Sequence, residues 1–228
     1  MSRVQAKTRE GAVEARPGSQ RTLLLGGLMV ALLAFVGVLV LIGQRGSRGP
    51  NTEQYENVQA EGRVLGSPEA PLLIQEYADF RCPHCRDASV QTTPSLIETY
   101  VVNNQVRFEI IPVGILGPES VLAAEAALCA EAQGRFWAYH DLLFARQGTM
   151  SYTQDSLISL ADGAGVNQQE FRDCLLSGRM RSVVQANNNA FQAAGATGTP
   201  AYIVGDQLVE GAVPFNQMQP IIEGQLGG

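Results

Sequence analysis

Two cysteines, Cys82 and Cys85, stand three residues apart within the stretch Phe-Arg-Cys-Pro-His-Cys at residues 80–85. A largely apolar run at residues 72–80 leads into this stretch, and a helix-compatible sequence follows it. A Cys-x-x-Cys pair at the point where a strand becomes a helix is typical of a redox centre. The sequence therefore predicts reversible thiol–disulfide chemistry at this position.

The residues between the cysteines favour an acidic thiol at Cys82. Pro83 fits the first turn of a helix, where its missing N–H costs nothing. Cys82 then becomes the N-cap residue, and a thiolate there would face unpaired N–H groups and the positive end of the helix dipole. An imidazole at His84 would lower the thiol pKa further. We expect Cys82 to be the exposed nucleophile and Cys85, one turn inward, to be the resolving thiol. A stabilised thiolate favours the reduced pair, so the disulfide should be oxidising.

Two other interpretations of the cysteine pair have less support. A purely structural Cys82–Cys85 disulfide would stabilise the fold little, because it closes a very short loop. A metal site would need two more ligands, but the chain has only two histidines and no second Cys-x-x-Cys. Redox chemistry is therefore the favoured interpretation.

The elements that must position this pair follow an α/β pattern. Strands are predicted at residues 72–80, 106–112, 200–204 and 207–209, with a Gly-Asp turn joining the last two. A helix is predicted at residues 83–102 and another at 215–225. A block of helices separates the second and third strands, at residues 120–133, 135–146, 153–161, 168–176 and 179–194. This order predicts a sandwich built on a mixed sheet.

Three stretches resemble the DsbA family of thioredoxin-fold thiol oxidases. They are residues 76–85 around the cysteine pair, residues 126–144 in the helical block, and Gly198-Thr199-Pro200. The Pro-His dipeptide between the cysteines is similar to that of the oxidase members. The resemblance implies a thioredoxin fold over residues 64–228, with a helical domain inserted at about 114–195.

The resemblance also implies roles for three residues outside the cysteine pair. Glu76 matches the buried acidic residue that moves protons at the resolving cysteine, as general acid–base catalysis requires, although it could be an ordinary polar strand residue. Pro200 matches the family's cis-proline. Thr199 would then face the disulfide and offer backbone groups to an extended substrate peptide.

The other two cysteines, Cys129 and Cys174, both lie in the helical block. They could be buried free thiols, which pack as small hydrophobic groups. Outside the cytoplasm, an even cysteine count favours a second, structural disulfide instead, and some family members resemble this arrangement.

An uncharged run of 20 residues, 23–42, precedes the predicted domain. As a helix it would be roughly 30 Å long, enough to cross the core of a bilayer. Five basic and two acidic residues come before it, so the positive-inside rule predicts a cytoplasmic N-terminus. We expect a cytoplasmic tail at 1–21, a transmembrane signal anchor at 22–43 and a linker at 44–63. A cleaved signal peptide is the alternative to the anchor.

The charge distribution argues against nucleic acid as a partner. Residues 1–42 carry a net charge of +3, whereas the rest of the chain, with 11 basic and 20 acidic residues, carries −9. No basic patch follows residue 50, and binding to a phosphate backbone depends on such a patch.

These features together predict a membrane-anchored, extracytoplasmic thiol–disulfide oxidoreductase. It would donate the Cys82–Cys85 disulfide to reduced substrate proteins and would need no organic cofactor. By resemblance, it would be reoxidised by a quinone-linked membrane protein of the DsbB or vitamin-K-epoxide-reductase type. A disulfide isomerase or reductase of the same fold is one alternative, and an extracytoplasmic metallochaperone or a non-catalytic binding module is another.

Overall fold

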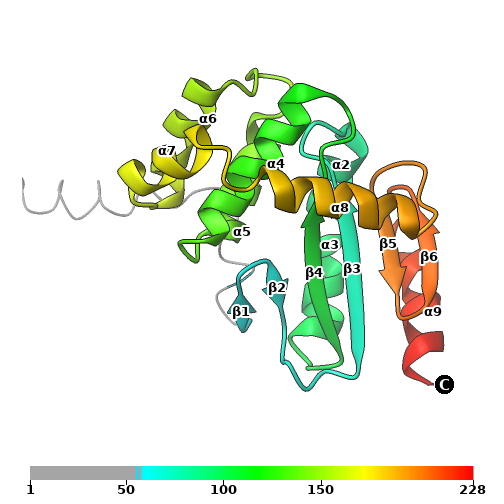
Figure 1. Cartoon of the computed structure of the whole chain (residues 1–228). Helices are drawn as coiled ribbons and strands as arrows, with labels where there is room; N and C mark the ends of the chain where they lie inside the picture. The colour runs from blue at the N-terminus through cyan, green and yellow to red at the C-terminus, as the bar shows by residue number, and fades with distance from the viewer. Residues whose placement is uncertain (1–54, 56–57, 228) are drawn as a thin grey trace, which may run out of the picture. The chain divides into compact units, whose positions relative to one another are not determined.

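A mixed six-stranded sheet forms the centre of the domain (Figure 1). The structure is a computed structural model that describes Tyr55 and residues 58–227. The strands lie in the order β1-β2-β4-β3-β5-β6. Their bounds are Ala60–Glu61 (β1), Val64–Leu65 (β2), Leu72–Ala78 (β3), Val106–Pro112 (β4), Ala201–Val204 (β5) and Gln207–Glu210 (β6).

Strand β3 carries the chain into the cysteine pair and lies inside the sheet. It pairs in parallel with β4 and antiparallel with β5. Successive side chains of a strand point to opposite faces. Ile74 and Glu76 therefore face one side of the sheet, and Tyr77 faces the other. Both faces are covered near the cysteines, which explains why this strand reads as almost continuously apolar.

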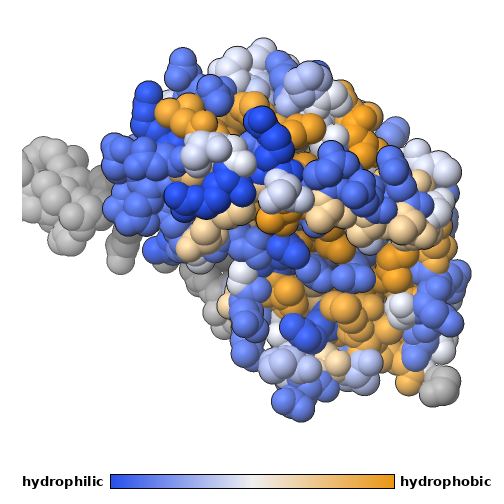
Figure 2. Space-filling view, in the orientation of Figure 1, coloured by the Kyte–Doolittle hydropathy of each residue, from blue (hydrophilic) through white to orange (hydrophobic). Residues whose placement is uncertain are grey.

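Helices cover the two faces unequally. On one face lie α2 (Pro83–Gln91), α3 (Thr93–Leu96), the π-helix η2 (Ile97–Val101) and α9 (Phe215–Leu226). Helix α8 (Arg181–Ala193) crosses the other face, where Phe191 packs edge-on against Tyr77. Figure 2 shows hydrophobic surface over the part of the sheet that α8 leaves open, where Leu73 is 39% exposed.

The single helix expected at residues 83–102 is divided into α2, α3 and η2. Pro94 has no N–H to donate to a preceding carbonyl and its ring crowds the preceding turn, which accounts for the interruption of the regular helix here. Thr92 joins the first two segments, since its N–H donates to the Ala88 carbonyl and its own carbonyl accepts from Leu96.

A helical insertion connects β4 to β5. It comprises α4 (Pro118–Glu131), α5 (Phe136–Arg146), α6 (Gln154–Ala161), the 3-10 turn η3 (Asp162–Ala164), α7 (Gln168–Leu176) and α8. Thr153 and Asn167 cap α6 and α7 with their side chains, which accounts for where these helices begin.

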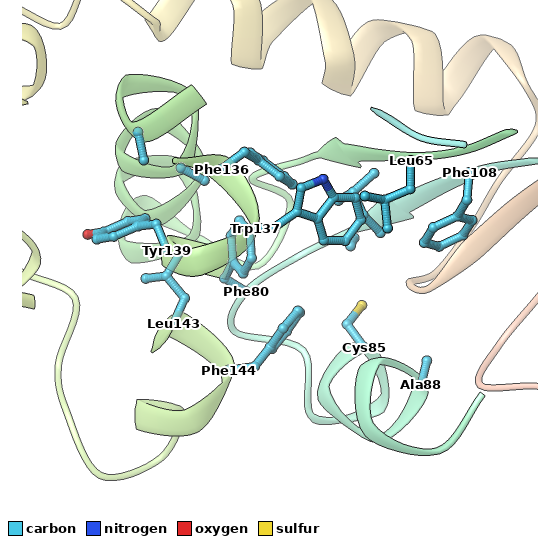
Figure 3. Close-up of a cluster of buried hydrophobic side chains, with 14 of the residues drawn as sticks. Leu65, Phe80, Cys85, Ala88, Phe108, Phe136, Trp137, Tyr139, Leu143 and Phe144 are labelled. Carbon is cyan, nitrogen blue, oxygen red and sulfur yellow. The ribbon is translucent and has the colours of Figure 1, made fainter. Parts of the chain in front are cut away.

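Aromatic side chains of α5 fix the insertion to the sheet. Trp137 lies 6.3 Å from Phe108 of β4 and 5.4 Å from Phe136, measured between ring centroids. Figure 3 shows Trp137 reaching from α5 toward Leu65 and Phe108, with Cys85 lying near the same cluster. These rings belong to one continuous hydrophobic core, as their helical spacing predicts.

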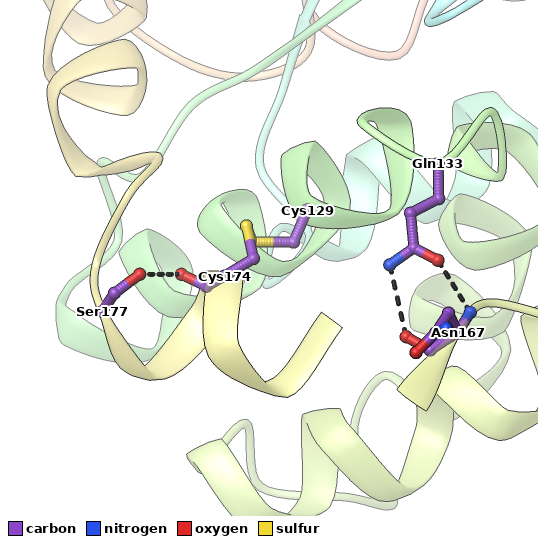
Figure 4. The surroundings of a disulfide bond; sticks show 5 residues. All are labelled: Cys129, Gln133, Asn167, Cys174 and Ser177. Atoms are coloured by element: carbon purple, nitrogen blue, oxygen red, sulfur yellow. Dashed lines mark hydrogen bonds between the residues drawn. A yellow bond between two sulfur atoms is a disulfide. The ribbon is translucent and has the colours of Figure 1, made fainter. Parts of the chain in front are cut away.

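A disulfide fastens the insertion internally. Cys129 of α4 and Cys174 of α7 are joined, with their Cα atoms 5.9 Å apart (Figure 4). In the same region the Asn167 N–H donates to the side-chain oxygen of Gln133 at 2.7 Å. Closing a loop of this length contributes on the order of 4 kcal/mol in the chain-entropy description.

The start of the domain differs from the expectation. Strand β1 lies within residues 44–63, the range expected to be a linker, and pairs with β2. A two-residue strand is too short to show an alternating pattern, so the sequence could not reveal it. The tail at 1–21, the signal anchor at 22–43 and most of the linker lie outside the described residues. Among the residues that are described, no helix is both long and apolar enough to cross a bilayer.

Candidate active site

The two cysteines lie where β3 gives way to α2. Cys82 is the N-cap residue of α2 and Pro83 is its first residue. The Cys82 carbonyl accepts from the N–H of Cys85 at 3.1 Å. This places Cys85 in the third helical position, where its side chain is fully buried.

Asp79 holds the loop before Cys82 in place. Its carboxylate is fully buried and accepts from the backbone N–H groups of Arg81 at 2.8 Å and Ile115 at 3.0 Å. Its own N–H lies 3.4 Å from the sulfur of Cys85. A buried carboxylate is stable only when such donors satisfy it, so Asp79 ties the end of β3 to the segment after β4.

Cys82 is more buried than expected. Only 5% of the residue is exposed, which corrects the expectation of an exposed nucleophile. Its sulfur lies 3.1 Å from the carbonyl oxygen of Thr199, which covers it. The Cys82 sulfur is therefore partly covered and does not lie on an open surface.

The pKa of Cys82 is lowered to about 5. The largest cause is a hydrogen bond from the Cys85 thiol, and burial opposes it by favouring the neutral form. The Thr199 side chain and the backbone N–H groups of Cys85 and His84 lower the pKa further. The His84 ring is exposed, so in this structure His84 contributes through its backbone N–H.

Glu76 and Cys85 form the buried side of the site. Burial is the main cause that raises the pKa of Glu76 to about 8, and the negative charge of Cys82 adds to it. Burial also raises the pKa of Cys85 far above that of an ordinary thiol, with contributions from Cys82 and Glu76. One oxygen of Glu76 has no hydrogen-bond partner. A carboxyl group that is neutral at pH 7 beside a thiol of high pKa can hand a proton to that sulfur.

Thr199 and Pro200 form the wall opposite the cysteines. The peptide bond between them is cis, and β5 begins at the next residue. Glu210 of β6 anchors the preceding turn by accepting from the N–H groups of Thr197 at 2.6 Å and Gly198 at 3.3 Å. The structure thus brings together every residue that the sequence placed at the redox site: Glu76, Cys82, Pro83, His84, Cys85, Thr199 and Pro200.

Two site residues were missed by sequence reasoning. The side-chain amide of Gln147, just after α5, donates to the carbonyl of Phe80 at 2.7 Å and to that of Cys82 at 3.0 Å. The Tyr152 hydroxyl donates to the Leu143 carbonyl at 2.7 Å and lies 3.4 Å from that of Phe80. No local pattern marks either residue, because both act on a loop more than 60 residues earlier in the chain.

His140 belongs to the core of the insertion. It is 1% exposed and its Nδ1 lies 2.9 Å from the carboxylate of Asp141. Aromatic rings surround it, including Phe144 with a centroid distance of 4.9 Å. His140 is therefore a buried residue of this core and lies outside the redox site.

Comparisons with known proteins identify the family. A family model described as thioredoxin matches residues 59–224. The Na(+)/H(+) antiporter NhaA 3 of Salinispora tropica is 33% identical over 155 residues, which cover 67% of this chain but 22% of the antiporter. The chain therefore spans only about a fifth of that relative's length.

Two further matches cover most of both chains. Disulfide bond formation protein D of Bacillus subtilis is 25% identical over 171 residues, covering 72% of this chain and 77% of that protein. The crystal structure of oxidised BdbD from Bacillus subtilis superposes with a TM-score of 0.68 at 23% identity, over 79% of this chain and 97% of that one. The chain therefore belongs to this thioredoxin family.

Proposed function

We propose that this protein oxidises the thiols of substrate proteins by donating its Cys82–Cys85 disulfide. The observation that carries the proposal is the difference in acidity between the two sulfurs. With a pKa of about 5, Cys82 is a thiolate at pH 7. At pH 7, which lies two units above this pKa, the stabilisation of the thiolate corresponds to roughly 3 kcal/mol, or about 60 mV in the potential of a two-electron couple. Stabilising the reduced pair makes its disulfide a stronger oxidant.

The reaction proceeds through a mixed disulfide on Cys82. A substrate thiolate attacks the Cys82 sulfur, the Cys82–Cys85 bond breaks, and Cys85 leaves as a thiolate. Because the pKa of Cys85 is high, this sulfur takes up a proton at once, and protonated Glu76 is the nearby donor. A second substrate thiolate then attacks the substrate's own sulfur and releases Cys82. The substrate gains a disulfide, and the enzyme gains the two electrons as a reduced pair.

The equilibrium potential of the Cys82–Cys85 pair against glutathione tests this direction. An oxidase should have a potential well above that of thioredoxins, which lie near about −270 mV. A thioredoxin-like value would reject the oxidase and favour a reductase of the same fold. An isomerase would instead reactivate a substrate with scrambled disulfides faster than it oxidises a fully reduced one.

A metallochaperone is the candidate from another class. A thiolate pair beside His84 could hold a soft metal such as copper. Metal analysis of the protein purified without chelators separates the two functions. Stoichiometric metal together with no oxidation of reduced substrate would reject the oxidase.

We place this reaction outside the cytoplasm. The Cys129–Cys174 disulfide supports this location, because such bonds persist in oxidising compartments. The uncharged run at residues 23–42 supports a single-pass anchor with the catalytic domain on the outer side. Release of the full-length protein from membranes by a carbonate wash would contradict the anchor.

Reoxidation requires a partner that accepts electrons from the reduced pair. We propose a quinone-linked membrane protein of the DsbB or vitamin-K-epoxide-reductase type, since anchoring would raise the effective concentration of the two proteins. Membranes that contain the partner should reoxidise the reduced protein only when quinone is present.

A further inference from the structure

A polar pocket lies beside the cysteine pair. Its volume is about 500 Å³, within the range of ligand pockets in proteins. Arg81, Pro83 and Arg86 line it from the catalytic loop and α2, Glu119 lines it from α4, and residues 147–152 line it from the segment after α5. We call it the Arg86 pocket. Arg81 and Pro83 are the chain neighbours of Cys82, so the pocket lies directly beside the cysteine whose sulfur reacts.

The pocket is rigid on its inner side. Gln147, which lines it, is bonded to the carbonyls of Phe80 and Cys82, and Tyr152, also in the lining, is 3% exposed. The Tyr152 hydroxyl is already engaged with the Leu143 carbonyl at 2.7 Å. A preformed wall fixed to the catalytic loop lowers the ordering cost of a bound chain.

Arg86 supplies a cation that is only weakly paired. Arg81 and Glu119 form a close ion pair at 3.0 Å and largely neutralise each other. Arg86 reaches the carboxylate of Asp87 only at 3.9 Å, beyond hydrogen-bonding distance, and its side chain is 44% exposed. The charged groups that line the pocket therefore leave one net positive charge, in a protein whose overall charge is −6.

We propose that the Arg86 pocket binds a carboxylate side chain of the substrate polypeptide, one to three residues from the cysteine that attacks Cys82. The guanidinium of Arg86 can form a bidentate pair with a carboxylate. The exposed residue Ser151 offers a further hydroxyl donor at the rim. An extended chain advances about 3.3 Å per residue, so a nearby substrate residue can reach the pocket while its cysteine lies at Cys82.

This inference rests on the proposed oxidase function, and one peptide experiment can separate the two. Three reduced peptides carry the same Cys-x-x-Cys centre and differ only at the second residue on each side of it, which is Glu, Gln or Lys. Single-turnover oxidation by the full-length oxidised protein is followed in low salt. We expect the Glu peptide to react about two- to fivefold faster than the Gln peptide, and the Lys peptide to react more slowly than both. High salt should shrink these differences, because the paired charges are exposed.

Variants identify the cation. Arg86→Gln should bring the Glu-to-Lys rate ratio close to one, and Arg86→Glu should invert it. Arg172→Gln, at an exposed arginine of α7, is the matched control and should keep the wild-type ratio. Because each ratio compares peptides on one protein sample, a partly unfolded variant does not distort it.

The outcomes are distinct. If the wild-type protein oxidises none of the peptides, the oxidase function itself is wrong. Oxidation of all three at equal rates, or a preference that survives Arg86→Glu, would reject the Arg86 pocket and leave the oxidase intact.

Discussion

Replacing Glu76 by Gln should change how the stability of the reduced protein depends on pH. The carboxyl group is 2% exposed and its pKa is raised from 4.5 to about 8. Below pH 4.5 the group is protonated in both the folded and the unfolded chain. Between 4.5 and 8 the folded chain keeps a proton that the unfolded chain has released, so this group makes stability fall as pH rises.

The size of the effect follows from the shift. Each pH unit costs about 1.4 kcal/mol, so from pH 5 to pH 8 Glu76 removes on the order of 4 kcal/mol. Cys82 acts in the opposite sense, because its pKa is lowered from 9.0 to about 5 and the folded chain releases its proton first. In the reduced wild-type protein, the opposite effects of Glu76 and Cys82 on the pH dependence of stability largely cancel. Glu76→Gln removes the effect of Glu76 and leaves that of Cys82. The stability of the reduced variant should therefore rise with pH over this range.

Urea denaturation of the reduced protein, at a series of pH values, measures this difference. The free energy of unfolding of Glu76→Gln minus that of the wild type should increase by about 4 kcal/mol between pH 5 and pH 8. Glu98→Gln, at an exposed helical glutamate, is the control and should give a flat difference. A difference for Glu76→Gln that does not change with pH would refute the idea that the carboxyl is buried and protonated.

Three other changes test the rest of the site. Cys85→Ala, mixed with a substrate that already carries a disulfide, should accumulate mixed disulfides on Cys82, visible on non-reducing gels, because the Cys82 thiolate attacks the substrate bond, releases one substrate thiolate and has no resolving thiol. The idea fails if Cys82→Ala traps the same adducts. Cys129→Ala combined with Cys174→Ala should lower the free energy of unfolding by about 4 kcal/mol, measured in urea, and an unchanged midpoint would show that the bond does not restrain the unfolded chain. Gln147→Leu should lower the free energy of unfolding by about 1–3 kcal/mol, because the carbonyls of Phe80 and Cys82 lose their side-chain donor. It should also shift the pH midpoint of Cys82 alkylation. A loss of stability without that shift would limit Gln147 to a structural role.

The cysteine site was predictable because its signals are local. A Cys-x-x-Cys after an apolar strand, with Pro83 at the first helical position, specifies the N-cap geometry almost completely. The mixed sheet and the helical insertion also followed from the order of strands and helices. The end of β3 was placed two residues too late, since Asp79 and Phe80 belong to the loop that Asp79 organises.

The remaining features depend on contacts between distant parts of the chain. The burial of Cys82 comes from the Thr199 carbonyl, 117 residues away. Gln147 reaches the same loop from a separation of 65 residues. The short strands β1 and β2 exist because they pair with each other and with β4, and pairing partners cannot be read from two-residue segments.

The amide of Gln147 also bears on how the molecule moves. It joins the insertion to the catalytic loop through two hydrogen bonds, so the insertion cannot separate from the sheet as a rigid body without first releasing the carbonyl of Cys82. Displacement of the insertion therefore also breaks the two hydrogen bonds that hold the catalytic loop, so the stability of the loop is coupled to the attachment of the insertion. A change that displaces the insertion would thereby also loosen the backbone at Cys82, the N-cap residue of α2.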